Sequence, residues 1–241
     1  MGLDVTRRRA MLAVVPLLSG WYGLALGADK ESPSPVPFTV ASVRLEQNAT
    51  DRDAEVVFEI KGGAEGLTKL TVISPDGRTV IEFTAPNTSG LSGIQQFRFE
   101  TPEHRDVKRL TTAYPEGVYS FVGATAAGEK LNSKSALSHK LPATVSFLRP
   151  GAGARGVGVR NLKVTWTPVK NIAAYIIKIE QPKAGVNLTS TLPEAMTTFA
   201  VPDGFLRAGT EYQLAVGTVS HEGNISFVET TFTTAGEGVK P

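Results

Sequence analysis

Short segments of alternating apolar and polar residues dominate the chain from residue 38 onward. In Val56-Val57-Phe58-Glu59-Ile60, the side chains of Val56, Phe58 and Ile60 face one side, as a half-buried strand requires. Segments of this length, separated by turn sequences such as Ser74-Pro75-Asp76-Gly77, are typical of a β-sandwich. The pattern predicts strands in the first half at 38–45, 54–61, 67–73, 79–84, 95–100, 118–125 and 133–140.

One segment of the first half follows a helical period instead. Val107, Leu110 and Tyr114 recur at helical spacing before Pro115. Thr101 suits the N-cap and Pro102 the first helical position. We therefore expect a short helix that covers one end of the sandwich with Val107 and Leu110, while its charged side chains face solvent.

The second half begins near Leu141-Pro142 and alternates more plainly. Apolar residues occupy every second position at Val164 and Trp166, at Tyr175, Ile177 and Ile179, at Phe199 and Val201, and at Tyr212, Leu214 and Val216. These alternations predict the strands of a second sandwich.

Three of these motifs resemble the fibronectin type III module over residues 141–235. They are Val164-Thr165-Trp166-Thr167-Pro168-Val169, Tyr175-Ile176-Ile177-Lys178-Ile179, and the run from Leu206 to Val216. The resemblance implies that Trp166 packs between the sheets and that the Tyr212 hydroxyl hydrogen-bonds to the chain upstream. The first half is similar only loosely, although its segment 115–123 parallels segment 209–217. We expect two related sandwiches in tandem.

Composition supports a turn-rich β protein and excludes several chemistries. The 241 residues include 24 glycines and 15 prolines without a collagen period. Cysteine is absent, which excludes disulfides, cysteine-based zinc and iron–sulfur sites, and thiol catalysis. The predicted fold class is all-β, with two fibronectin type III or immunoglobulin-like sandwiches after a signal peptide.

The first residues have the layout of an export signal. Arg7, Arg8 and Arg9 precede an apolar stretch that ends in small residues at Ala25-Leu26-Gly27. The stretch is too short and too rich in Gly and Pro for a membrane-spanning helix. Arg8-Arg9-Ala10-Met11-Leu12 also resembles a twin-arginine signal, and the sequence leaves the choice between this route and the general one open.

The predicted plan has five parts. It assigns 1–27 to the signal peptide, 28–37 to a Pro/Ser-rich spacer, 38–141 to a sandwich with one helix, 142–235 to the second sandwich and 236–241 to a flexible tail.

Charge gives no support for nucleic-acid binding. Of 25 basic and 23 acidic residues, the export signal holds three arginines and Asp4, so the rest of the chain has 22 of each and no formal net charge. The sequons at Asn48, Asn87, Asn187 and Asn224 are interpreted as chance matches in polar turns.

Motifs that imitate reactive sites lack their context. Residues 151–156 satisfy G-x-G-x-x-G, but the following segment, 157–166, alternates like a strand and not like a helix. His104-Arg105-Asp106 lacks the rest of a kinase signature. His139 and His221 suit strand ends and turns, and no nucleophile elbow is present.

The sequence offers few residues that could form a metal site or a sugar-binding site. Asn48, Asp51 and Asp53 offer fewer oxygens than calcium needs. Beyond residue 27 the single tryptophan is Trp166, which is assigned to the core, so aromatic platforms for sugars are scarce. We expect no catalytic, cofactor-binding or metal-binding residues.

The sequence thus predicts an exported, non-catalytic protein of the bacterial envelope, periplasmic or extracellular, that acts as an interaction or spacer module. Its expected partner is another envelope or extracellular protein, and contact with the membrane is expected only through the uncleaved signal. The loops around Gly185, 221–225 and 151–158 are the candidate binding surfaces. The alternative is a secreted hydrolase or a polysaccharide-binding accessory to one.

Overall fold

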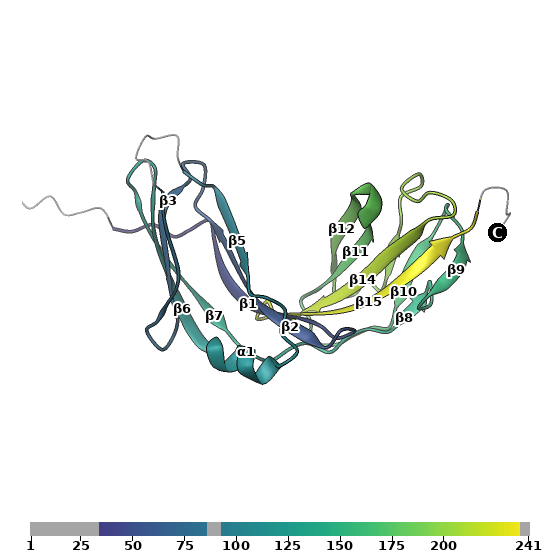
Figure 1. Cartoon of the computed structure of the whole chain (residues 1–241), viewed down its shortest axis with the longest axis horizontal. Helices are drawn as coiled ribbons and strands as arrows, with labels where there is room; N and C mark the ends of the chain where they lie inside the picture. The colour runs from purple at the N-terminus through teal and green to yellow at the C-terminus, as the bar shows by residue number, and fades with distance from the viewer. Residues whose placement is uncertain (1–33, 86–92, 237–241) are drawn as a thin grey trace, which may run out of the picture. The chain divides into compact units, whose positions relative to one another are not determined.

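The computed structural model describes residues 34–85 and 93–236. The predicted signal peptide, residues 28–33 of the spacer, the sequon at Asn87 and tail residues 237–241 lie outside the described residues. The described chain forms two β-sandwich domains (Figure 1), which we call domain 1 (34–141) and domain 2 (142–236). This confirms the predicted all-β fold class.

Domain 1 contains two layers. One layer has the order β1-β2-β5 and the other β4-β3-β6-β7. Its elements are β1 (Val40–Asn48), β2 (Asp53–Lys61), β3 (Leu67–Ile73), β4 (Thr79–Thr84), β5 (Gln96–Glu100), α1 (Val107–Ala113), β6 (Gly117–Thr125) and β7 (Lys130–Leu137). Alternate side chains of both layers, among them Phe58, Leu70 and Phe121, form its buried core.

Domain 2 repeats the same arrangement. One layer has the order β13-β10-β8 and the other β12-β11-β14-β15, with β9 added beside β15. Its elements are β8 (Phe147–Arg149), β9 (Ala154–Val157), β10 (Lys163–Trp166), β11 (Ala174–Gln181), the 3₁₀ turn η1 (Pro182–Ala184), β12 (Val186–Pro193), β13 (Thr198–Ala200), β14 (Glu211–Val219) and β15 (Ile225–Thr234). Apart from β9, the strands of the two domains taken in chain order occupy equivalent places, which agrees with the predicted tandem of related sandwiches.

Trp166 fills the centre of domain 2 as predicted. It is 1% exposed and meets the ring of Tyr175 edge-on, with 5.4 Å between the ring centres. Its indole nitrogen has no hydrogen-bond partner among the described residues. The side chain therefore contributes through packing, and its polar atom adds a cost to burial.

A tyrosine fastens β6 in domain 1 and the equivalent strand β14 in domain 2. The Tyr212 hydroxyl on β14 accepts a hydrogen bond from the Arg207 backbone N–H at 2.9 Å, as the resemblance implied. On the equivalent strand β6, the Tyr119 hydroxyl donates to the Pro115 carbonyl at 3.1 Å. The likeness of segments 115–123 and 209–217 thus reflects a shared structural device.

The helix begins later than predicted. Asp106, not Thr101, is its N-cap, because the Asp106 carboxylate accepts a hydrogen bond from the Arg109 N–H at 3.0 Å. Thr101 instead prolongs β5: its hydroxyl accepts from the Val56 N–H at 3.0 Å. The predicted covering role is confirmed, because Leu110 is buried and Val107 packs against the core.

The predicted strand at 157–166 is wrong in its extent. Residues 154–157 form β9, which pairs in parallel with β15, whereas β10 begins only at Lys163. Asn161 lies between them with φ +54°, a left-handed conformation that breaks an extended strand. Alternation across 157–166 spanned two strands and the loop that joins them.

Part of the predicted spacer is hydrogen-bonded to domain 1. The Val36 N–H donates to the Lys130 carbonyl at 3.0 Å, and the Val36 carbonyl accepts from the Asn132 N–H at 2.9 Å. These bonds cover an edge of β7. Among residues 34–85 and 93–236, no helix has both the length and the apolar character needed to cross a bilayer.

Replacing Tyr212 with Phe should lower the free energy of unfolding by about 1–3 kcal/mol, because the part-buried Arg207 N–H loses its acceptor. Denaturant unfolding of the purified protein measures this loss. Tyr114→Phe is the control, since the Tyr114 hydroxyl bonds to no described residue, and it should change stability little. An unaltered unfolding curve for Tyr212→Phe would contradict the structural role of the hydroxyl.

Candidate functional site

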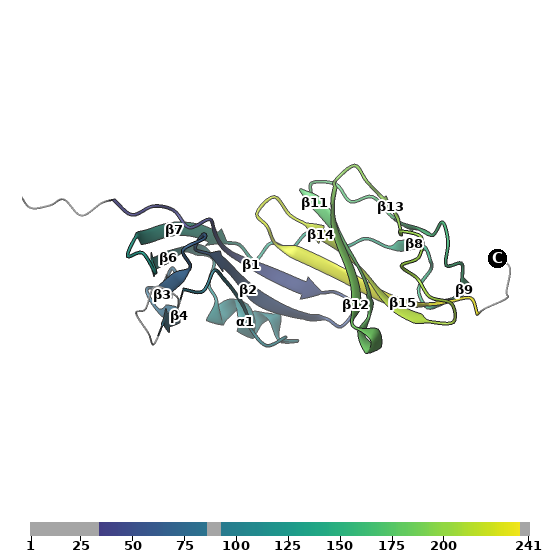
Figure 2. The same ribbon diagram turned by 90° about the horizontal axis from the view of Figure 1, so that it is seen from above.

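The two domains share one sheet. The last part of β1 in domain 1 lies beside the first part of β15 in domain 2 (Figure 2). The two strands pair in parallel, with Glu46, Gln47 and Asn48 opposite Ile225, Ser226 and Phe227. The Ala49 N–H then donates to the Phe227 carbonyl at 2.8 Å. The strands run without interruption in the order β12-β11-β14-β15-β1-β2-β5. We call this contact and the side-chain bonds around it the junction.

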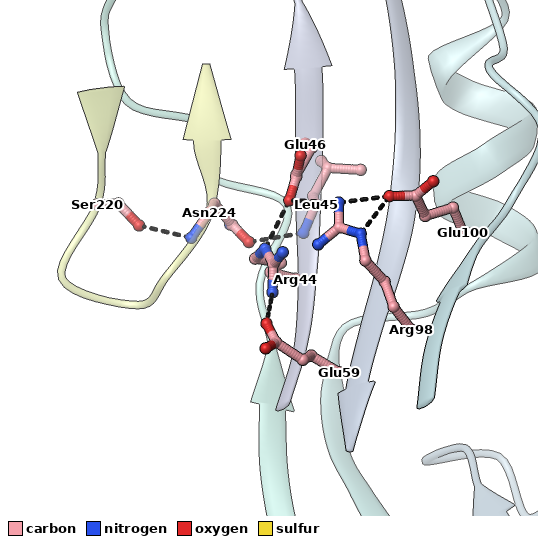
Figure 3. A network of polar contacts seen from close by, with 8 residues as sticks. All are labelled: Arg44, Leu45, Glu46, Glu59, Arg98, Glu100, Ser220 and Asn224. Atoms are coloured by element: carbon pink, nitrogen blue, oxygen red, sulfur yellow. Dashed lines mark hydrogen bonds and ion pairs between the residues drawn. The ribbon is translucent and has the colours of Figure 1, made fainter. Parts of the chain in front are cut away.

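Asn224 is the centre of the junction (Figure 3). It follows the turn between β14 and β15 and is 1% exposed. Its Oδ1 accepts a hydrogen bond from the Leu45 N–H at 2.9 Å, and its Nδ2 donates to the carbonyls of Ser138 at 2.8 Å and Lys140 at 3.1 Å. One side chain of domain 2 therefore binds β1, the end of β7 and the interdomain connection.

The turn before Asn224 holds it in place. The Asn224 N–H donates to Ser220 Oγ at 3.2 Å, and the Ser220 N–H donates to the Asn224 carbonyl at 2.8 Å. Gly223 between them has φ +93°, a conformation that side chains rarely adopt. Asn224 therefore lies at a turn, as the sequence indicated, but the turn directs its amide into the protein interior.

Four further side chains fasten the domains to each other or to the connection between them. Ser226 Oγ donates to the Pro142 carbonyl at 2.8 Å and accepts from Gln47 Nε2 at 2.8 Å. Thr218 Oγ1 donates to the Ala143 carbonyl at 2.7 Å. Thr50 Oγ1 accepts from the Glu229 N–H at 2.8 Å. Because Ser226 and Thr218 are fully buried, breaking these bonds would leave polar atoms without water or partner.

A row of charged side chains lies on β1, β2 and β5 beside the junction (Figure 3). Arg44 Nε is 2.7 Å from Glu46, and Arg44 Nη1 is 3.4 Å from Glu59. Arg98 pairs with Glu100 and lies 3.7 Å from Glu46. Only 9% of the Glu46 side chain is exposed, so its carboxylate depends on these guanidinium groups for compensation of its charge.

Glu55 extends this row with a further carboxyl group. It lies directly opposite Glu46 in the pairing of β1 with β2. Burial, followed by the carboxylates of Glu100 and Glu46, raises the pKa of Glu55 from its ordinary value of 4.5 to about 7. Glu55 therefore changes charge close to neutral pH.

A small cavity of about 130 Å³ opens between the domains beside Glu55. Its acidic lining residues are Glu46, Asp53, Glu55, Glu103 and Glu229, together with the cation Lys178. The Lys178 ammonium lies over the Phe227 ring, 4.4 Å from its centre. In the part of the chain that the structure describes, no group of three or more potential ligands has a geometry that could hold a metal ion.

The three histidines of the chain lie in turns or form structural contacts. His104 pairs with Ala54 through backbone hydrogen bonds, and His139 Nε2 lies 2.8 Å from the Tyr114 carbonyl, to which it donates. His221 lies in the turn that precedes Asn224. No hydrogen bond between described residues joins a serine hydroxyl to a histidine ring.

The acidic turn at 48–53 and the glycine-rich loop also have structural places. The Asn48 amide donates to the Asp51 carboxylate at 3.0 Å and thereby closes the turn between β1 and β2. Residues 151–158 contain β9, beside the end of β15. Thus the loop 221–225 belongs to the junction, whereas the loop 151–158 lies at the other end of β15.

Asn224 was missed as a junction residue because its sequence signal is weak. The run Ile225-Ser226-Phe227-Val228 reads as a buried strand with one polar position, and Ser226 is in fact fully buried. A small polar residue in an apolar strand indicates a specific partner. The sequence alone did not identify that partner as another domain.

Replacing Asn224 with Ala should lower the free energy of unfolding by about 1–3 kcal/mol, because the buried Leu45 N–H loses its acceptor. Denaturant unfolding followed by intrinsic fluorescence measures the change. The matched control is Asn187→Ala, which removes an exposed asparagine of β12 and should have little effect. Equal stability of the two variants would contradict the assignment of Asn224 as a structural centre.

Stability should fall as pH rises from about 4.5 to 7. In this interval the folded protein keeps the Glu55 proton while the unfolded chain has released it, so rising pH favours unfolding. Melting temperatures recorded between pH 4 and 8 measure the slope, and Glu55→Gln should flatten it. Glu65→Gln, on the exposed turn before β3, should leave it unchanged. If the melting temperature of Glu55→Gln depends on pH as steeply as that of the unaltered protein, another group causes the pH dependence.

Comparison with known proteins gives fold neighbours. No family model and no curated protein matches the chain. Among solved structures, a two-domain fibronectin type III segment of chicken tenascin is 15% identical, with a TM-score of 0.32 and coverage of 81% of this chain and 98% of that chain. The fibronectin(III)-like modules of Clostridium thermocellum CbhA are 14% identical, with a TM-score of 0.34 and coverage of 88% and 95%. The FN1-FN3 domains of chicken CNTN1 are 15% identical, with a TM-score of 0.32 and coverage of 84% and 68%. These neighbours contain fibronectin type III domains, the family that the sequence pattern resembles, and at this similarity they say nothing about ligands.

Proposed function

We propose that this chain is an exported, non-catalytic interaction or spacer module of the bacterial envelope that holds its two domains in a fixed arrangement. The observation that carries the proposal is the junction, in which a shared sheet and a buried asparagine join the domains. A connection between independent domains normally allows motion unless their interface is extensive. Here the backbone and side-chain bonds oppose rotation about the connection at 140–143.

A fixed joint suits a spacer that also engages a partner. Because β15 pairs with β1 at its beginning and with β9 at its end, the loops at the far end of domain 2 are held relative to domain 1 through one continuous strand. A partner bound at those loops would therefore be held at a set distance and orientation. Export to the envelope is supported by the arginines and the apolar stretch within residues 1–27.

The rival function, a hydrolase or a polysaccharide-binding accessory, has no specific observation in its favour among the described residues. The His139 ring is engaged by a backbone carbonyl, and Trp166 is buried in the core. These contacts favour a rigid interaction module over the rival function.

Rigidity can be measured directly, because the chain contains no cysteine that would take up a label. Spin labels at Lys69→Cys in domain 1 and Lys183→Cys in domain 2 occupy exposed positions. We expect pulsed electron resonance on residues 28–241 to give a single narrow distance distribution. Adding Asn224→Ala should broaden it, whereas adding the control Asn187→Ala should not.

Two outcomes would refute the rigid module. One is a broad distribution in the chain that carries only the labels. The other is a narrow distribution that Asn224→Ala leaves unchanged, since the junction would then not be the cause of the fixed geometry.

A further inference from the structure

An open cavity of about 640 Å³ lies at the end of domain 2 remote from the junction. It is formed where β8 passes into β9 and onward to β10, beside Ala235 and Gly236 at the end of β15. Its volume is in the range of ordinary ligand sites. The glycine-rich loop 151–158, which carries no nucleotide-binding helix, provides one of its walls.

Three arginines surround the cavity. Arg149 ends β8, Arg155 lies in β9, and Arg160 lies in the loop before β10. All three are exposed, and none forms a salt bridge with another described residue. The described lining contains no Asp or Glu side chain.

An acidic side chain, Asp203, holds one of the loops at the cavity. The Asp203 carboxylate accepts a hydrogen bond from the Asn161 N–H at 2.8 Å and so holds the loop that carries Arg160. Because acids and bases balance over residues 28–241, three cations with no acidic side chain in the described lining of the cavity are a local concentration of positive charge. The complementary ligand is anionic, and guanidinium groups bind carboxylates in paired hydrogen bonds.

The rest of the lining includes aliphatic side chains. Val157, Val159 and Leu162 contribute to it, and no aromatic side chain is present in the described lining. Sugar rings and nucleic-acid bases are usually held by aromatic faces, which this cavity does not offer. An aliphatic side chain placed between acidic ones is a better match for such a surface.

The backbone around the cavity is accessible to an extended chain. β8 is the outer strand of the layer β13-β10-β8, so one of its edges has no neighbour within that layer. Gly156 has φ +68° and open space where a side chain would start, with no atom within 4 Å. A peptide could therefore lie along this edge with its backbone close to the loop.

We propose that this cavity binds an acidic, extended segment of a partner protein, whose carboxylates pair with Arg149, Arg155 and Arg160 and whose aliphatic side chain contacts the aliphatic side chains of the lining. The inference deepens the proposed function, on which it rests, because it gives the module a contact at the end that the junction holds in place. It also identifies the loop 151–158 as the binding loop among the three candidates of the sequence.

The test uses residues 28–241 and a fluorescent peptide, acetyl-Glu-Glu-Leu-Glu-Glu-Val-Glu-amide, with the matched peptide in which Gln replaces each Glu. Fluorescence polarisation should give saturable binding of the acidic peptide, which weakens as salt increases. Replacing Arg149, Arg155 and Arg160 together with Gln should weaken binding about tenfold or more, because charge-assisted hydrogen bonds are lost.

A second triple variant controls for net charge. Arg105, Lys108 and Arg109 are exposed residues of domain 1, and their replacement with Gln removes the same charge from another place. This variant should bind the acidic peptide like the unaltered protein. Circular dichroism and unfolding curves of both variants confirm that each is folded.

Several results would overturn the assignment. They are absence of saturable binding, equal binding of the Gln peptide, equal loss in both triple variants, or binding of polygalacturonate or polyphosphate through the three arginines while the acidic peptide fails to bind. If the peptide does not bind, the distance distribution between the two spin labels can still be narrow. If the domains are not rigidly joined, that distribution is broad even where the peptide binds. The two proposals are thus refuted by different measurements.

Discussion

The hydrogen bond from the Leu45 N–H to the Asn224 side chain lies at the centre of the contact by which β15 of domain 2 joins β1 of domain 1. It is buried, and the same amide also binds the end of β7 and the residues that lead into domain 2. A contact of this kind has a narrow geometric tolerance, because a small displacement leaves several polar groups without a partner. The arrangement of the domains therefore depends on the hydrogen bonds of Asn224 together with the pairing of β1 and β15.

The polar character of the junction bears on specificity. Buried polar groups often add little net stability compared with apolar packing, yet they favour the one arrangement in which all of them are satisfied. Ser226 and Thr218 are fully buried beside Asn224, and each has its partner in the residues that connect the domains. An apolar contact of similar extent would tolerate sliding, whereas this one selects a single register.

The sequence predicted what depends on local periodicity. Strands such as β3 and β4, the core position of Trp166 and the Tyr212 corner followed from alternation and from a family resemblance. The helix start was misplaced because Thr101 and Asp106 are both good caps, and the choice depended on pairing of Thr101 with Val56. The junction and the arginine cavity escaped prediction, since both bring together residues that are far apart in the chain and carry no local pattern.

The junction also orders the events of folding. Leu45 and Asn224 are 179 positions apart, so the outer edge of β1 lacks its neighbour until the chain has been made as far as β15. Contacts of such long sequence separation form late and slow the search for the native state, because a large loop must close first. Meanwhile the unpaired edge is open to strands of other chains. A chain interrupted before β15 would thus have a permanently open edge in domain 1. Protection of domain 1 against pairing with other chains therefore requires completion of domain 2.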